Sequence, residues 1–309
     1  MSPEQIAALA AKAAPLPGAV IPDPDGNREL HIDGDYAAYY FSGNDETTIS
    51  QAKRNMLDAF QIVKDYGGVG GRVVVHLSAA SSDKGKRWQI GTVKPYQGQR
   101  DSGRKPKNWQ GMRDFLEAGM PGSNVRAKLW YDREADDGVA ASARFAHERG
   151  KLPVIFSSDK DFRMIPGLHV VWTTYETVLL KPGTFELIGP DEKVYGDKWF
   201  WLQMIQGDAA DNIPGLERIK GKTGFKTCGE ACAKEVLKSI DNNGDAYFNV
   251  SLVYEDYYGE EWADRFVEQA ALLWMRSDNK ADVADFLKVI PQPEAAIHRA
   301  IIKLKERIK

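Results

Sequence analysis

Cysteine and histidine are scarce in this chain. Its 309 residues include two cysteines, Cys228 and Cys232, and five histidines. Two cysteines cannot build the set of disulfides that stabilises small secreted proteins. No histidine stands at ligand spacing from the cysteine pair, so the pair is either half of a metal site or two idle thiols. We favour idle thiols and expect a reducing, cytoplasmic location.

Long apolar runs and an excess of positive charge are also missing. No apolar run is long enough to span a bilayer, so we expect no membrane partner. The alanine-rich residues 6–14 are interrupted by Lys12 and lack a basic lead-in. This pattern favours a short helix or loose arm at residues 1–28 over a signal peptide. The formal net charge of −3 argues against a uniformly basic nucleic-acid-binding protein.

Basic charge is instead concentrated in one segment. Residues 84–113 contain nine lysines and arginines but one acid, Asp101. The stretch 81–108 has no clear helix or strand pattern, and Trp88 and Tyr96 stand among its charges. Cations interleaved with aromatic rings favour binding of a nucleic-acid strand by charge and stacking. A solvated loop without a role is the alternative.

Strand and helix patterns alternate between about residues 29 and 190. The apolar or β-prone runs 30–32, 72–77, 125–131, 153–157 and 169–173 are separated by helical periodicity at 47–65 and 136–149. Alternation of this kind predicts an α/β fold with a mostly parallel sheet and helices on both faces. The runs 178–180 and 185–188, joined by Pro182-Gly183, predict a hairpin. Beyond about residue 190 the pattern is helical, which predicts a second domain.

Carboxylates follow the strands and loops in five clusters. The nine residues are Asp33, Asp83, Glu134, Asp136, Asp137, Asp159, Asp161, Asp208 and Asp211. A single cluster could simply cap a helix. The carboxyl ends of parallel strands, however, meet at one edge of the sheet, where like charges repel unless divalent cations lie among them. The whole set therefore predicts a multi-metal site for phosphoryl transfer.

Six stretches that carry these acids and the basic segment form a recognisable series. They are His31-Ile32-Asp33-Gly34, Asp83-Lys84-Gly85-Lys86, Pro95-Tyr96-Gln97-Gly98-Gln99-Arg100-Asp101, Glu134-Ala135-Asp136-Asp137, Ser158-Asp159-Lys160-Asp161-Phe162 and Gly207-Asp208-Ala209-Ala210-Asp211-Asn212-Ile213-Pro214-Gly215. In this order and with these gaps, the chain resembles the structure-specific 5′ nuclease (flap endonuclease) family. The resemblance is greatest to bacteriophage and bacterial 5′–3′ exonucleases, and covers about residues 30–276.

The resemblance implies a PIN-like 5′ nuclease fold: a metal-dependent nuclease domain at 29–190 with a basic helical arch at about 81–115, and a helical duplex-binding domain at 191–309. It implies that the nine acids hold two or more Mg²⁺ or Mn²⁺ ions. We expect Asp33, Glu134, Asp136 and Asp159 to be inner ligands, and Asp208 and Asp211 to serve a second ion. Asp35, two residues after Asp33, is a further candidate because it would share a strand face with Asp33.

The resemblance also implies contacts to DNA. Arg100 matches an arch arginine that contacts the scissile phosphate, and Tyr96 matches a tyrosine that stacks on a base. The expected lysine after this tyrosine is Gln97, so we assign Lys94, one helical turn earlier if the segment is helical, and Lys84 to the catalytic group. Residues 211–225 resemble a helix-three-turn-helix, which binds duplex phosphates and a monovalent cation, K⁺ in our assignment. The residues that we assign to DNA binding, besides Tyr96, are Lys86, Arg87, Gly215, Arg218, Lys220 and Lys222.

The resemblance therefore implies a 5′–3′ exodeoxyribonuclease with flap endonuclease activity. We expect it to act on duplex ends, nicks and 5′ flaps, with RNA–DNA hybrids as a further substrate class. A phage-type role in replication or DNA degradation would place it in the host cytoplasm. Two alternatives stay open: a related PIN-like ribonuclease, and a non-catalytic DNA-junction-binding protein.

Overall fold

The computed structural model describes residues 21–98, 105–216, 219–221, 224–226 and 228–308. Three basic residues that the sequence assigns to DNA, namely Arg100, Arg218 and Lys222, lie outside these ranges. Most of the predicted N-terminal arm, residues 1–20, also lies outside them. In the described residues, no helix is long and apolar enough to cross a membrane.

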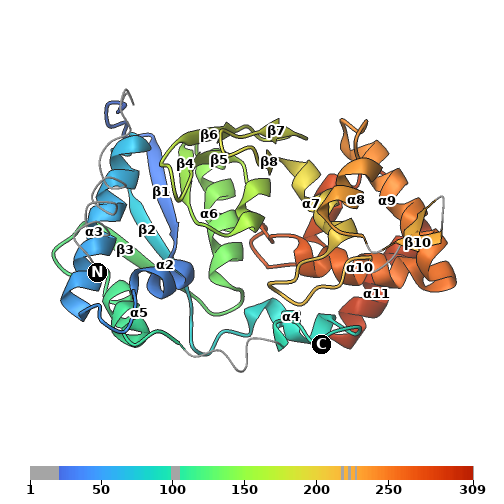
Figure 1. The fold of residues 1–309 in the computed structure, drawn as a ribbon, viewed down its shortest axis with the longest axis horizontal. Coiled ribbons are helices and arrows are strands. Elements are labelled where there is room, and N and C mark those ends of the chain that lie inside the picture. The colour runs from blue at the N-terminus through green and yellow to red at the C-terminus, as the bar shows by residue number, and fades with distance from the viewer. Residues whose placement is uncertain (1–20, 99–104, 217–218, 222–223, 227, 309) are drawn as a thin grey trace.

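A six-stranded sheet forms the centre of the N-terminal half (Figure 1). Its strand order is β3-β2-β1-β4-β5-β6, with the first five strands parallel and β6 antiparallel to β5. The prediction of a mostly parallel sheet is confirmed. The strands are β1 (Arg28–Asp33), β2 (Val73–Ser78), β3 (Val125–Trp130), β4 (Leu152–Phe156), β5 (Gly167–Val170) and β6 (Thr177–Leu180).

The register of the sheet places the ends of β1, β2 and β4 side by side. Asp33, the last residue of β1, pairs with His76 of β2, and Ile32 pairs with Phe156, the last residue of β4. Because these strands are parallel, the residues that follow them meet at one edge of the sheet. Three of the predicted acid clusters begin at or near this edge.

Helices cover both faces of this sheet, as predicted. One face packs against α2 (Gly34–Phe41), α3 (Ile49–Tyr66) and α5 (Trp109–Glu117) through a core that includes Ile32, Phe60 and Leu116. The α3 helix follows its sequence pattern: Thr48 accepts the Gln51 N–H as an N-cap, and the buried side chains recur at helical spacing. The other face packs against α6 (Ala135–Glu148).

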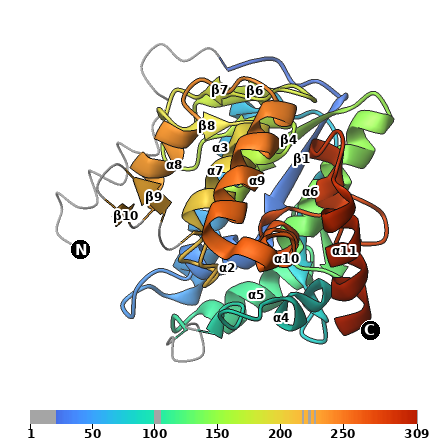
Figure 2. The same cartoon turned by 90° about the vertical axis from the view of Figure 1, so that its right-hand side faces the viewer.

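The C-terminal half is helical. Its elements are α7 (Asp197–Gln206), the hairpin β9 (Ile219–Gly221) and β10 (Gly224–Lys226), α8 (Glu230–Val236), α9 (Asn243–Tyr258), α10 (Trp262–Leu273) and α11 (Ala295–Arg307). The apolar core between α6 and the sheet continues into this half, from Val139 through Phe162 to Trp201 and Phe266. Figure 2 shows the helical half from its own side. One core therefore crosses the predicted domain boundary and joins the two halves.

The predicted hairpin of residues 178–180 with 185–188 is wrong. β6 turns back on β5 instead, and the short β7 (Leu187–Ile188) pairs with β8 (Val194–Tyr195). The chain reverses at Tyr175, whose φ of +57° is a left-handed turn conformation. Val178 and Leu180 are then buried against Tyr195, so long-range packing overrides the turn signal of Pro182-Gly183.

Candidate active site

Four acids lie at the carboxyl edge of the sheet; we call Asp33, Asp159, Glu134 and Asp136 the sheet group. Asp33 caps α2 by accepting the Tyr36 N–H at 3.1 Å. The Ser157 hydroxyl donates to Asp33 Oδ2 at 2.9 Å, and the Ser157 hydroxyl oxygen accepts the Asp159 N–H at 3.0 Å. This serine therefore ties the acid that ends β1 to the acid that follows β4.

The other two members of the sheet group stand at the start of α6. Glu134 has an extended backbone and immediately precedes the helix, and Asp136 lies in its first turn. Ser78, the last residue of β2, accepts the Ala135 N–H at 2.9 Å and so holds the helix start at the sheet edge. The helix dipole favours negative charge at this position.

Asp137 lies in different surroundings from Glu134 and Asp136, because it is paired with Arg87. Its side chain is fully buried, and both carboxylate oxygens bind the Arg87 guanidinium, at 2.6 and 3.0 Å. It also accepts the Arg276 N–H at 2.7 Å. With its oxygens engaged in this way, Asp137 belongs to the scaffold, and the metal-ligand role predicted for it is not supported by this geometry.

The sheet group is electrostatically unbalanced. Burial raises the pKa of Asp33 to about 6, and the charge of Asp35 adds to this effect. Burial likewise raises the pKa of Asp159 to about 6, with a further contribution from Asp33. The pKa of Asp136 is raised well above its ordinary value, first by burial and then by Asp137 and Glu134. These carboxylates are close enough to repel one another, which is the arrangement that a divalent cation relieves.

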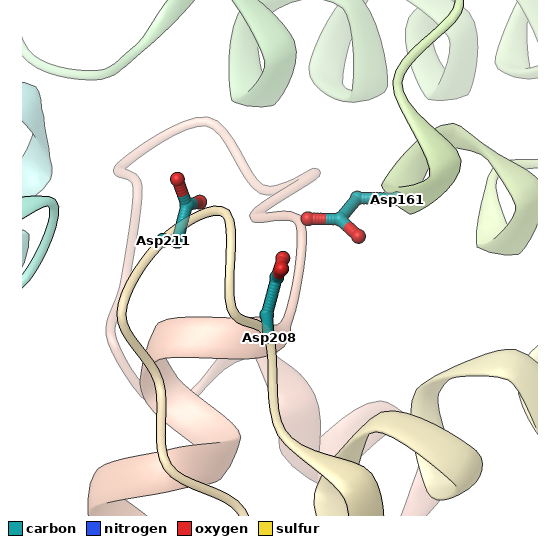
Figure 3. Close-up of side chains that lie close together, drawn as sticks. All are labelled: Asp161, Asp208 and Asp211. Atoms are coloured by element: carbon teal, nitrogen blue, oxygen red, sulfur yellow. The ribbon is translucent and has the colours of Figure 1, made fainter. Parts of the chain in front are cut away.

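Three further acids form what we call the loop group: Asp161, Asp208 and Asp211 (Figure 3). Each offers an oxygen within 4.8 Å of the oxygens offered by the other two. Asp161 follows β4 in the 3₁₀ turn η3 (Lys160–Met164), whereas Asp208 and Asp211 share the loop after α7. Burial raises the pKa of Asp161 to about 8, and the charge of Asp159 contributes, so the two groups are coupled.

The loop group contains its own cation, which the sequence analysis did not assign. The Lys160 ammonium lies 2.5 Å from Asp208 Oδ2 and 3.5 Å from Asp161 Oδ1. Gln203 on α7 donates to Asp161 Oδ1 at 2.6 Å. Lys160 stands between two candidate acids in the sequence, which was a usable signal. Gln203 carried no such signal, because only the fold brings α7 beside η3.

Asp35, and not Asp83, has its carboxylate at the end of β2. The Asp83 side chain is exposed and accepts the Gly85 N–H in the loop after β2. The Asp35 carboxylate instead meets the end of β2, where it accepts the Ser78 N–H at 3.2 Å and the Arg113 guanidinium at 2.6 Å. Burial raises the pKa of Asp35, and Arg113 opposes this effect. Asp35 lies in the first turn of α2, so the strand β1 does not continue to it as expected. We propose Asp35, rather than Asp83, as a further acid beside the sheet group, at the end of β2.

The root of the basic segment consists of the turn η1 (Lys84–Lys86) and α4 (Arg87–Ile90), which run beside the C-terminal helices (Figure 1). The prediction that Arg87 binds DNA is wrong, because its side chain is 2% exposed and is held by Asp137, Glu134 and the Trp274 carbonyl. Lys86 donates to the Ile308 carbonyl at 3.1 Å, so its contact anchors the segment to the end of α11.

Farther along the basic segment, Tyr96 contacts acids of both groups. Tyr96 donates its hydroxyl to Glu134 Oε2 at 2.8 Å and also lies 3.2 Å from Asp211 Oδ2. In this arrangement the Tyr96 hydroxyl points into the acid site, and stacking on a base stays a prediction. Lys94 is exposed on a stretch that is not helical, so the helical turn that would bring it beside Gln97 is absent there.

The predicted duplex-binding residues are described only in part. Gly215 is buried, and its N–H and C=O are both engaged by Gln269, at 2.9 and 3.0 Å. The prediction that Gly215 binds a DNA phosphate through its backbone is therefore wrong. Lys220 lies in β9, and its side chain is outside the description. The helix-three-turn-helix stays a prediction.

The amino-acid sequence is similar to known proteins over about a third of its length, and it matches only a minor part of each relative. No protein-family model matches. A thermostable DNA polymerase I of Thermus filiformis is 30% identical over 112 residues, which are 35% of this chain and 13% of the polymerase. The DNA polymerase I of Deinococcus radiodurans is 36% identical over 98 residues, 30% of this chain and 9% of the polymerase. A 5′–3′ exonuclease of Buchnera aphidicola is 29% identical over 122 residues, 39% of this chain and 38% of that protein.

Solved structures match far more of the chain. The bacteriophage T5 5′-exonuclease with bound zinc has a TM-score of 0.52 at 16% identity, covering 91% of this chain and 100% of that one. A T5 flap endonuclease solved with DNA and metal ions has a TM-score of 0.52 at 15% identity, covering 91% and 99%. At this identity the match establishes the fold. The chain therefore has the fold of the T5 5′-exonuclease, and the resemblance to structure-specific 5′ nucleases is borne out in both sequence and structure.

Proposed function

We propose that this protein is a metal-dependent 5′ nuclease that hydrolyses phosphodiester bonds in DNA. The observation that carries the proposal is the meeting of the sheet group and the loop group, seven carboxylates from elements far apart in sequence. Like charges that are buried together at one edge of a sheet repel one another and destabilise the fold. Such clusters are found mostly at functional sites, where a bound cation offsets the repulsion. The matches to 5′–3′ exonucleases support the same reading.

The donor set fits hard divalent cations. Carboxylate oxygens are the ligands that Mg²⁺ and Mn²⁺ take, and the raised pKa values of Asp33, Asp159 and Asp161 mark sites where added positive charge is favourable. We assign one ion to the sheet group and one to the loop group, with Mg²⁺ as the physiological metal. Bound ions supply a polarised water and stabilise the leaving oxygen. We also propose that K⁺ binds at residues 211–225, where a helix-three-turn-helix is expected.

The reaction is the hydrolysis of one phosphodiester bond. Water attacks phosphorus, the bond from phosphorus to the 3′ oxygen breaks, one water proton is lost and the 3′ oxygen gains one. Within the protein, Ser157 and the backbone N–H groups of Tyr36 and Asp161 orient the Asp33 and Asp159 carboxylates, which would hold the divalent ion of the sheet group. Arg87 holds the start of α6 through Asp137.

We propose DNA duplex ends, nicks and 5′ flaps as substrates, with RNA–DNA hybrids as a further class. The matches to replicative polymerases and to a phage enzyme support a role in replication or in phage DNA metabolism, in the cytoplasm of the cell or of the infected host. The test is a 5′-flap duplex labelled at either end, incubated with Mg²⁺ or with EDTA. Products that require Mg²⁺ and begin at the 5′ end or the flap junction support the proposal.

Matched substrates and variants decide between the alternatives. An RNA duplex that is cut in preference to DNA would indicate the PIN-like ribonuclease. Tight junction binding without cleavage in Mg²⁺ or Mn²⁺ would leave the non-catalytic binder. Asp136→Asn is expected to abolish cleavage while retaining DNA binding, and Asp58→Asn, an exposed acid on α3, serves as the control with unchanged activity.

A further inference from the structure

The edge strand β3 carries two exposed cations on the side of the sheet that faces α6. The register aligns Arg126 with Val74 and His31 in one row across the sheet. The next row on this side pairs Lys128 with His76. Paired residues of neighbouring parallel strands share a face, so Arg126 and Lys128 lie on one face of the sheet. Both side chains are exposed, because no further strand covers β3 among the described residues.

Helix α6 runs beside this face and links it to the acid site. Glu134 of the sheet group directly precedes the helix. Gly138, in the second turn, leaves room for the Trp130 indole at the end of β3, with which a Cβ at position 138 would collide. One turn later, Ser142 Oγ lies 3.4 Å from the Lys128 ammonium. The seam between α6 and β3 therefore begins at the sheet group and leads away from it past Lys128.

Two arginines stand at the far end of this seam. Arg72 and Arg149 both bind the Glu29 carboxylate, at 2.9 and 2.8 Å, and their side chains are 45% and 34% exposed. Because two guanidinium groups share one carboxylate, positive charge is left over. Arg72 and Arg126 also line a pocket of about 490 Å³ between the starts of β2 and β3. We call Arg72, Arg126, Lys128 and Arg149 the basic track.

The basic track has more positive charge than its own contacts neutralise. Among the described residues, the Arg126 side chain forms no hydrogen bond or ion pair. The pKa of Lys128 is lowered, first by partial burial and then by the charge of Arg133. Arg72 lowers this pKa further, and Asp132 opposes the effect. Repulsion among like charges is relieved by a bound ion of opposite charge, so this face favours an anion.

We propose that the basic track binds the single-stranded 5′ flap of a DNA substrate through its phosphates. This inference rests on the proposed nuclease function and states where the flap lies outside the acid site. Arg126 and Lys128 are two residues apart on one strand, or about 6.6 Å, so each can meet a different phosphate of an extended strand. The Phe145 ring on α6 is 53% exposed, with the Arg149 guanidinium 4.6 Å from its centre, and offers a surface on which a base can stack. Because the track leads into the acid site, it suits a strand of the substrate better than an acidic protein.

The first test is DNA binding with Ca²⁺ in place of Mg²⁺. The wild type is expected to bind a duplex with a 5′ flap of about 12 nucleotides roughly tenfold more tightly than the same duplex without a flap. The double variant Arg126→Gln/Lys128→Gln should lower this advantage at least about threefold, with binding of the flapless duplex unchanged. Lys181→Gln/Lys193→Gln removes the same charge from two exposed sites elsewhere and should retain the full advantage.

The salt dependence of binding counts the phosphate contacts. Each phosphate of a single strand that a cation neutralises contributes roughly 0.7 to the slope of log K against log salt concentration. Loss of two contacts in Arg126→Gln/Lys128→Gln should therefore lower the slope for the flap duplex by about 1.4. The Tm of this variant should equal that of the wild type, because both side chains are exposed. An unchanged slope contradicts the proposal.

The two proposals can fail separately. If the wild type cleaves no DNA, the nuclease proposal fails, and the comparison of flap and flapless duplexes in Ca²⁺ still decides the role of the basic track. If the wild type cleaves DNA but gains no affinity from the flap, the basic track is not a flap-binding site. The same conclusion follows if Arg126→Gln/Lys128→Gln retains the full flap advantage.

Discussion

The sheet group and the loop group contain the same kind of side chain but are balanced in different ways. The acids of the sheet group project from the ends of β1 and β4 and the start of α6, and hydrogen bonds from Ser157 and the backbone orient them. The loop group encloses the Lys160 ammonium and is braced by Gln203. The Arg87 and Lys84 side chains pair with Glu134 in the sheet group, but the pKa values of Asp33, Asp136 and Asp159 are still raised by burial and by neighbouring acids. In the loop group, the Lys160 ammonium contacts Asp161 and Asp208 directly.

This difference has a consequence for metal binding. An ion that enters the loop group has to displace the Lys160 ammonium from Asp208, whereas an ion that enters the sheet group meets carboxylates that mainly repel one another. We therefore expect the sheet group to bind its ion more tightly and to contribute more to catalysis.

The largest effect is expected from removing one acid of the sheet group. Asp136→Asn should lower kcat at least roughly 1,000-fold, which corresponds to about 4 kcal/mol, because it removes a carboxylate that faces Asp159 and Glu134. Asp208→Asn in the loop group should cost roughly 10–100-fold. Single-turnover flap cleavage measures both rates. Equal losses in the two variants would remove the distinction between the groups.

The next largest effect is a loss of folding stability, expected when the buried Arg87–Asp137 ion pair is broken. Arg87→Met should destabilise the protein by about 3 kcal/mol or more, because it leaves the buried Asp137 carboxylate without its partner. Denaturant unfolding measures the free energy. Arg144→Met, which removes an exposed pair with Glu148 on the same helix, should cost less than about 1 kcal/mol. If Arg87→Met left stability intact but weakened DNA binding, the scaffold role of the pair would be wrong and the DNA-binding role predicted for Arg87 would be restored.

The stability of the metal-free protein should fall as pH rises from about 5 to 8. The folded-state pKa values of Asp33 and Asp159, about 6, and of Asp161, about 8, exceed the ordinary value of 3.8. The folded state therefore binds more protons than the unfolded chain, and this stabilisation is lost as pH passes through those values. A loss of about 2 kcal/mol is expected. Thermal unfolding in EDTA at pH 6 and pH 8 measures it.

Divalent cations supply the control for this prediction. Mg²⁺ favours the ionised carboxylates, so it should raise Tm more at pH 8 than at pH 6. A metal-free protein that is equally stable at both pH values would show that the acid groups carry no net repulsion in solution.

The smallest effect concerns the cation inside the loop group. Lys160→Met should tighten Mn²⁺ binding to this group by about fivefold, or about 1 kcal/mol, since a partly exposed ion pair no longer competes with the ion. Isothermal titration with Mn²⁺ measures the weaker of the two sites. The same substitution should leave the tighter site unchanged, and an effect on the tighter site instead would reverse the assignment of the two ions.

The sequence predicted much of the sheet and several of the acids correctly because both depend on local patterns. Strands β1 to β5 follow their β-prone runs, and α3 follows its helical periodicity and its Thr48 cap. Once the strands were expected to be parallel, Asp33 and Asp159 were expected to meet at one edge, and Ser157 joins them there.

Other assignments failed because they depend on partners far away in the chain. Arg87 belongs to a basic run in sequence, yet Asp137, 50 positions later, buries it. Gly215 lies in a stretch that resembles a phosphate-binding motif, yet Gln269 engages its backbone. The strand β6 returns to β5 because burial of Val178 and Leu180 outweighs the local turn signal.

The amino-acid sequence by itself determined the alternation of strands and helices, the order of the acids along the chain and the concentration of basic charge near residue 84. These properties are set by composition and by periodicities of two and 3.6 residues. Tertiary structure alone decided which charges are buried against each other. It turned Arg87 into scaffold, brought Lys160 among the acids and left Lys84 exposed beside Glu134. Burial and ion pairing are properties of three-dimensional neighbours, which local sequence patterns do not encode.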